Sequence, residues 1–184
     1  MGINSSLLGL IGNTPILKLN AFDTGKCELF VKLESHNPGG SIKDRIGLSI
    51  IEEAEKSGEL KPGGTIIEAT AGNTGIGLAL VAAIKGYKII LVIPDKMSRE
   101  KILHLEGLGA EIILTRSDVP EGHPEYYQDL ARKLFLKLRE LSWLINSQIL
   151  LIPWRTGPQR LLKYGNKWKE RWMQWLLVSV LEAL

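Results

Sequence analysis

The apolar positions of residues 27–133 follow two periods that alternate along the chain. Short runs rich in valine, isoleucine and leucine predict strands at 27–34, 64–70, 87–95 and 110–116. Apolar residues at helical spacing predict helices at 41–58, 75–86 and 98–109, and a helix that begins within 123–133. Strands that alternate with helices of this length are typical of βαβ units. The pattern therefore predicts a parallel α/β sheet with helices on both faces.

The composition is that of an ordinary soluble protein, with 45% hydrophobic and 23% charged residues among 184. No apolar run reaches the length of a membrane span, and the first residues lack the basic region of a signal peptide. Cys27 is the single cysteine, which excludes an internal disulfide and fits a reducing compartment. We expect a cytoplasmic chain without a membrane partner.

The charge and the residue usage change after residue 133. Residues 1–133 carry 15 Lys/Arg against 17 Asp/Glu, whereas residues 134–184 carry 8 against 3. All five tryptophans lie in this second part, which holds 2 of the 19 glycines. No linker rich in proline, glycine or serine marks a new domain there. The two parts therefore differ in character without an ordinary domain boundary between them.

Two glycine-containing loops lie where a parallel sheet binds ligands, at the carboxyl ends of its strands. The first is EATAGNTGIG at 68–77, where a strand leads through a glycine-rich turn into a helix. Its glycines let a ligand approach the backbone, and the helix start offers free N–H groups to an anion. The second is HNPGGSIKDR at 36–45, where a glycine pair precedes a helix.

Lys43 lies near the start of that helix, and two interpretations of it are open. The helix dipole, the neighbouring Arg45 and burial would all disfavour the ammonium form, and a neutral lysine attacks an aldehyde. A lysine in a first helical turn can equally be simply solvated. The other loop, Gly72–Gly77, also fits an imperfect dinucleotide-binding turn, in which Asp95 at the end of the next strand would hold a ribose.

Four blocks in order carry a family resemblance: IGNTP at 11–15, NPGGSIKDR at 37–45, ATAGNTGIGLA at 69–79 and VIPDKMSREK at 92–101. Together they closely resemble the cysteine synthase and cystathionine β-synthase family, the fold-type-II enzymes that use pyridoxal phosphate. The resemblance covers residues 5–133. It implies a three-layer parallel α/β sheet of the tryptophan synthase β type, of which the chain holds an N-terminal part. Residues 1–36 would begin the larger domain, and residues 37–133 would form the smaller, mobile one.

The resemblance also implies a site. Lys43 would form the Schiff base with pyridoxal phosphate, and Asn73 would bond the ring hydroxyl of the cofactor. The loop that binds the carboxylate of the substrate amino acid would consist of Thr70, Ala71, Gly72, Asn73 and Thr74. Ala71 stands where many members have serine, which removes one hydroxyl donor and leaves the backbone N–H groups.

The implied reaction is β-replacement on an activated serine, O-acetylserine or serine, by a sulfur nucleophile, giving cysteine or cystathionine. We expect a small amino-acid substrate and no nucleic-acid partner. The family commonly forms homodimers, and for this chain that assembly stays open. We expect no metal site, because His36, His104 and His123 have no further ligand-type residue at metal spacing.

Residues 134–184 depart from the family pattern, and we interpret them as an out-of-frame tail. A one-base shift lets INSQILLIPWRT at 145–156 read NQFANPANPLAH, which continues the family pattern. The phosphate loop and the hydroxyl for the pyridine nitrogen are then missing, so we expect a truncated chain that is inactive or weakly active. The alternative is a functional tail helix. Trp168, Trp172 and Trp175 lie at i, i+4 and i+7 among basic residues and could bind a membrane, nucleic acid or a partner protein.

Overall fold

A computed structural model describes residues 5–23, 25–70, 72–145 and 149–151 of the chain. Within them the strands are β1 Ile16–Leu19, β2 Leu29–Lys32, β3 Thr65–Ala69, β4 Lys88–Pro94, β5 Glu111–Thr115 and β6 Ile149–Leu151. The α-helices are α1 Lys43–Lys56, α2 Asn73–Lys85, α3 Arg99–Gly107 and α4 Tyr127–Ile145. Two short 3₁₀ helices, η1 Leu7–Leu10 and η2 Glu34–His36, precede β1 and α1.

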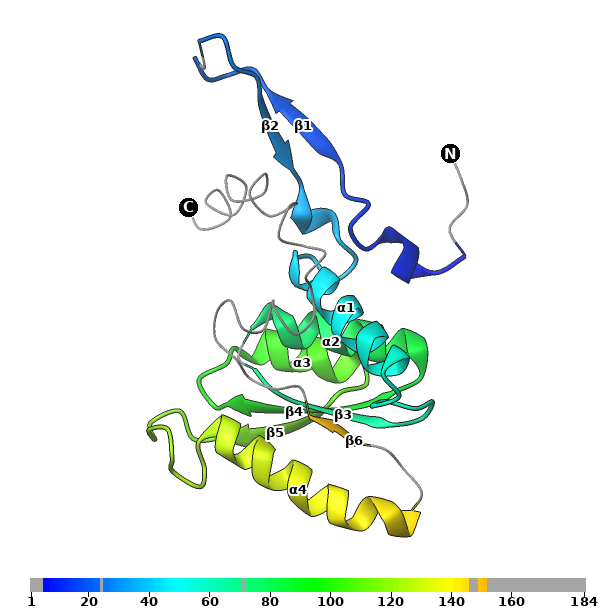
Figure 1. Ribbon diagram of the computed structural model, residues 1–184. Coiled ribbons are helices and arrows are strands. Elements are labelled where there is room, and N and C mark those ends of the chain that lie inside the picture. Colours follow the sequence, from blue (N-terminus) through cyan, green and yellow to red (C-terminus); the bar gives the residue numbers. More distant parts are fainter. Residues whose placement is uncertain (1–4, 24, 71, 146–148, 152–184) are drawn as a thin grey trace.

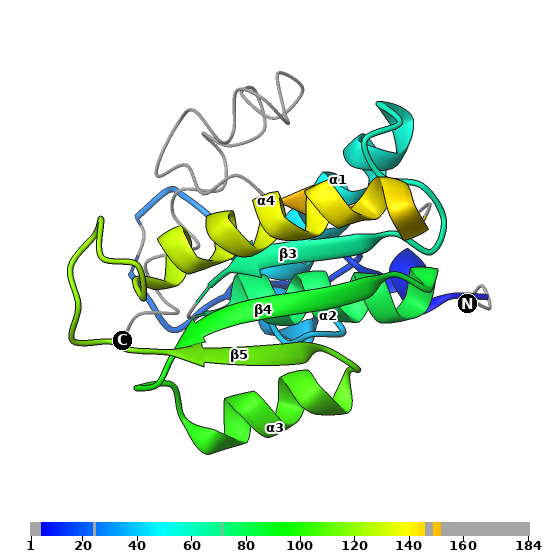
Figure 2. The same ribbon diagram turned by 90° about the horizontal axis from the view of Figure 1, so that it is seen from below.

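The central sheet has the strand order β5-β4-β3-β6, and every neighbouring pair is parallel. Helices α1, α2 and α3 cover one face of this sheet, and α4 covers the other (Figures 1 and 2). The predicted parallel α/β sheet with helices on both faces is therefore confirmed. The order also brings the carboxyl ends of β3 and β4 next to each other, at the edge from which the 68–77 loop emerges.

The two central strands are buried on both faces, which explains the apolar run of β4 and the adjacent isoleucines of β3. Successive side chains point to opposite faces. Ile66 and Leu91 join the core under α1 and α2. Ile67 and Val92 join the smaller core under α4, where Ala131 packs against them. A sequence that alternated apolar and polar residues would have left one face open to water.

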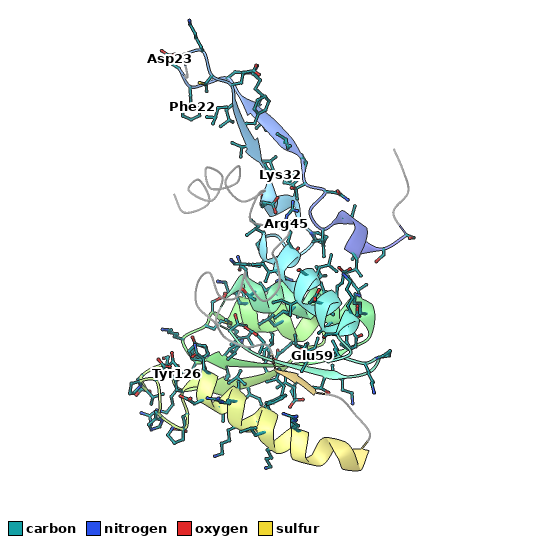
Figure 3. The ribbon with its side chains drawn as sticks, in the orientation of Figure 1. Phe22, Asp23, Lys32, Arg45, Glu59 and Tyr126 are labelled. Atoms are coloured by element: carbon teal, nitrogen blue, oxygen red, sulfur yellow. The ribbon has the colours of Figure 1, made fainter. Side chains whose placement is uncertain are left out.

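Strand β2 lies inside the predicted strand at 27–34, but it does not join the parallel sheet. It pairs antiparallel with β1, which the sequence pattern did not predict, and the hairpin projects away from the sheet (Figure 1). Its apolar side chains are open to solvent, with Ile16 64% exposed and Leu17 and Phe30 each 50% exposed. The labelled Phe22 lies at the hairpin tip (Figure 3). The hairpin therefore presents an uncovered apolar surface on both faces of a two-stranded ribbon.

Helix α4 begins at Tyr127, four residues after the start of the predicted segment. Pro124 disfavours helical backbone at His123, the residue before it. The residues ahead of the helix form a turn instead, in which the N–H of Tyr126 donates to the carbonyl of His123 at 2.8 Å.

The same helix continues past residue 133 without interruption, and β6 then pairs with β3. The expected change of reading frame thus falls inside a continuous helix. The proposed tryptophan helix lies outside the described residues. Among the helices that are described, none is long and apolar enough to span a membrane.

Candidate cofactor site

Helices α1 and α2 cross with their backbones in contact, and two glycines permit this approach. A Cβ atom on Gly77 would lie 2.6 Å from the carbonyl oxygen of Lys43. A Cβ atom on Gly47 would lie 2.6 Å from the carbonyl carbon of Gly77. The first turn of α1 therefore rests on the second turn of α2. On α2, Asn73 lies four residues, about one helical turn, before Gly77.

Lys43 is the first residue of α1, and its side chain is half-buried. Its backbone N–H donates to Oγ of Ser41 at 3.1 Å. The structure thus confirms that the Gly-Gly-Ser loop leads directly into the helix that carries the lysine. It places the lysine at the positive end of a 14-residue helix.

The loop after β3 ends in a helix start that the described side chains leave uncapped. Thr70 is buried, and its Oγ1 accepts from the N–H of Gly72 at 3.3 Å. Gly72 is the N-cap of α2 and makes no side-chain cap, while Asn73 and Thr74 form the first turn. Ala71 lies outside the described residues. The first-turn amides of α2 are therefore groups that an anionic ligand can use.

A buried glutamate that sequence reasoning missed lies behind this site. Glu34 is 2% exposed and makes a two-pronged ion pair with Arg45, with Nε at 2.8 Å and Nη2 at 2.9 Å from its two oxygens. Thr14 and Asn37 each donate one further hydrogen bond to the carboxylate, at 2.9 Å. Burial by itself would raise the pKa of Glu34, but the hydrogen bonds from Arg45, Asn37 and Thr14 together lower it.

The ion pair of Glu34 and Arg45 contradicts one expectation from the sequence. We expected Arg45 to disfavour the ammonium form of Lys43 by its positive charge. The guanidinium is instead neutralised by Glu34 and also donates to the carbonyl of Gly12 at 2.7 Å.

Asp44 occupies the interior side of the same helix start. It is fully buried, and its Oδ2 accepts from the N–H of Gly39. Its Oδ1 has no hydrogen-bond partner among the described residues. A Cβ on Gly39 would lie 2.5 Å from this oxygen, so the first glycine of the pair makes room for a protein side chain. Burial raises the pKa of Asp44, and the charge of Glu34 raises it further.

Asp95, the residue of the dinucleotide alternative, follows β4 and is exposed. Its Oδ1 accepts from the N–H of Ser117 at 3.2 Å, and its own N–H donates to the carbonyl of Thr115 at 2.8 Å. This side chain is thus engaged in holding the loop that follows β5. Asp95 therefore has a local structural role at the ends of β4 and β5.

The acid stability of the chain is expected to depend on Glu34. A carboxyl group whose pKa is lowered by folding stabilises the folded state above its ordinary pKa of 4.5, and this contribution is lost as the pH falls through the lowered value. Urea unfolding between pH 3 and pH 6 should show a steeper loss of stability on acidification for the natural chain than for Glu34→Gln. Parallel curves for the two proteins would contradict the assignment.

Comparison with known protein families identifies the family to which the chain belongs. The family described as pyridoxal-phosphate dependent enzymes matches residues 7–149. The chain belongs to this family. The cofactor that the site would hold is therefore pyridoxal phosphate. The resemblance to cysteine synthases and cystathionine β-synthases is confirmed.

Two curated members of the pyridoxal-phosphate enzymes show how much of a relative the chain spans. It is 56% identical over 124 residues to cystathionine β-synthase of Mus musculus, and the matched region covers 64% of this chain and 22% of that protein. It is 54% identical over 127 residues to cysteine synthase of a Flavobacterium species, and the matched region covers 68% of this chain and 41% of that protein. The chain thus spans between about a fifth and two fifths of these relatives.

Solved structures of the pyridoxal-phosphate enzymes share the fold. A hydrogen sulfide-producing enzyme from Fusobacterium nucleatum superposes with a TM-score of 0.67 at 41% identity, over 82% of this chain and 46% of that one. O-ureido-L-serine synthase superposes with a TM-score of 0.63 at 37% identity, over 80% of this chain and 44% of that one. The three-layer arrangement is therefore part of the fold-type-II architecture.

Proposed function

We propose that the chain carries the lysine-bearing part of a site for β-replacement on an activated serine, O-acetylserine or serine. The incoming group is a sulfur nucleophile, and the product is cysteine or cystathionine. The observation that carries the proposal is the crossing of α1 and α2, which packs the backbone of Lys43 against Gly77 in the second turn of α2. The similarity to proteins named cystathionine β-synthase and cysteine synthase supports the choice of reaction.

The groups at this crossing fit pyridoxal phosphate. The cofactor has an aldehyde for a primary amine, a ring hydroxyl for an amide, and negative charge for helix N-termini. Lys43 would supply the amine and Asn73 the amide. When bound, the cofactor supplies an electron sink for the α-carbon of an amino acid. The described residues therefore match its aldehyde and ring-hydroxyl sides.

The chain's own residues would have three tasks. Lys43 would hold the cofactor and then take the proton from the α-carbon of the substrate. The N–H groups of the loop 70–74 would bind the substrate carboxylate, because this loop ends in the first turn of α2, where a helix carries positive partial charge. Asn73 would orient the cofactor ring by a hydrogen bond to its hydroxyl. Because Ala71 has no hydroxyl, the substrate carboxylate would be bound by the backbone N–H groups and by Thr70 and Thr74.

A titration with pyridoxal phosphate tests the proposal without requiring turnover. The purified chain should gain the visible absorbance of a lysine-bound cofactor, and the part that survives dialysis reports cofactor held by a site, because the same bond on a surface lysine hydrolyses. NAD added at the same concentration should neither bind nor compete. A chain that stays colourless after dialysis but binds NAD would replace this proposal with the dinucleotide alternative of Gly72–Gly77 and Asp95.

A further inference from the structure

The carboxylate of Glu34 connects three residues, namely Thr14 ahead of β1, Asn37 at the end of η2 and Arg45 on α1. Its Oε1 accepts from Oγ1 of Thr14 and from Nη2 of Arg45, and its Oε2 accepts from Nε of Arg45 and Nδ2 of Asn37. Each oxygen thus has two donors, which satisfies the acceptor capacity of a carboxylate. An ion pair this well hydrogen-bonded is lost as a unit when one partner is removed, because the other is left buried and charged.

The guanidinium side of the pair reaches the IGNTP block, to which the proposed function assigns no task. Nη2 of Arg45 donates to the carbonyl of Gly12 at 2.7 Å. A Cβ on Gly12 would lie 2.5 Å from Nη1 of Arg45, and Gly12 has φ +83°, so glycine suits this position in two respects. The N–H of Gly12 donates to Oδ1 of Asn37 at 2.8 Å. The first two sequence blocks therefore meet at Arg45, which Figure 3 labels.

The position of Arg45 on α1 links this cluster to the lysine. Residues two apart on a helix point about 200° apart, so the Arg45 and Lys43 side chains leave α1 on opposite sides. No described side chain caps the start of α1 from its N-cap residue, Ile42. The first turn is held by the Ser41 hydroxyl, by the contact with Gly77, and by the ion pair of Arg45 with Glu34.

We propose that Glu34 and Arg45 are a positioning pair, which fixes the first turn of α1 and thereby the direction in which Lys43 presents its amine to the cofactor. The inference rests on the proposed role of Lys43. The pair touches neither cofactor nor substrate, and it acts through the helix backbone. Its loss loosens the first turn, which then keeps the Ser41 hydroxyl and the contact with Gly77.

The other end of α1 offers a matched control. Glu55 accepts from Nζ of Lys85 at 2.7 Å and from the hydroxyl of Tyr87 at 2.8 Å, which ties the last turn of α1 to the region where α2 ends. Glu55→Gln therefore weakens an ion pair on the same helix far from Lys43. A purely stabilising role of Glu34 would give both variants the same pattern of effects.

The test compares Glu34→Gln, Arg45→Met and Glu55→Gln in the full 184-residue chain. Amide exchange of the peptide at 41–47 should become about tenfold faster in Glu34→Gln, since a hydrogen bond to a charged group is worth roughly that factor. Labelling of Lys43 by pyridoxal phosphate, trapped by borohydride, should slow by a similar factor. Glu55→Gln should leave both rates unchanged and speed exchange only near residue 55.

Each outcome decides the proposal. Unchanged exchange at 41–47 and unchanged labelling in Glu34→Gln would overturn it, as would equal changes in Glu55→Gln. If Arg45→Met fails to fold, Glu34→Gln carries the test, because it keeps the side-chain shape. If the natural chain shows no labelling of Lys43, the proposed function fails, while the exchange measurement still decides whether the pair fixes the first turn.

Discussion

Replacing Gly77 with alanine is expected to lower the free energy of unfolding by about 1–3 kcal/mol or more, the usual cost of overpacking. The added methyl would lie 2.6 Å from the carbonyl oxygen of Lys43 and 2.9 Å from its carbonyl carbon. Both are backbone atoms, which cannot rotate away, so α1 and α2 must separate. Urea unfolding followed by helical circular dichroism measures the change. Gly47→Ala should act in the same direction, because it meets the backbone of Gly77 from the opposite side.

Gly107 provides the control for this prediction. It is the last residue of α3, its φ is not positive, and a Cβ there would meet no atom within 4 Å. Gly107→Ala should therefore leave stability unchanged or raise it slightly, because alanine favours helix over glycine. Equal unfolding midpoints for Gly77→Ala and the natural chain would show that the helices do not cross at this glycine, and the proposed site would lose its geometric basis.

Replacing Lys43 with alanine is expected to abolish the dialysis-resistant absorbance of the pyridoxal phosphate complex while the fold is retained. The lysine is half-buried in the first turn of α1, where alanine is a better helix former. Loss of the amine removes the covalent bond to the cofactor aldehyde, and a hydrogen bond from Asn73 cannot replace it. Absorbance after dialysis measures the bond, and circular dichroism checks the fold.

Lys56→Ala is the matched control, because Lys56 ends the same helix and is exposed. Pyridoxal phosphate reacts with many lysines, so this comparison separates a site from general modification. Lys56→Ala should keep the full dialysis-resistant absorbance. If the two variants lost the same fraction of it, the absorbance would report scattered surface lysines.

The sheet and its covering helices could be predicted from the sequence because their apolar periods are long and end at glycine. The strand at 87–95 and the helix at 75–86 correspond to β4 and α2 with small shifts of their ends. The hairpin is different. Strand β1 has four residues, three of them exposed, so its pattern carries little burial signal, and its pairing with β2 depends on a partner across a loop.

The site could be predicted in part. The loops around Lys43 and Asn73 were visible as glycine-rich turns before helices, whereas the crossing that joins them depends on two helices that are separated in sequence. A signal for the crossing existed, since glycines inside helical patterns are unfavourable and often mark close packing, as Gly47 and Gly77 do here. Glu34 had no such signal, because a single acidic residue after a strand most often lies on the surface.

The most direct test of the account is to find which lysine binds the cofactor. The chain is incubated with pyridoxal phosphate, reduced with borohydride and digested, and the labelled peptides are identified by mass spectrometry. The label should concentrate on Lys43, and excess substrate amino acid, added before reduction, should compete it away. Label spread evenly over exposed lysines such as Lys56 and Lys96, with none favoured at Lys43, would contradict it.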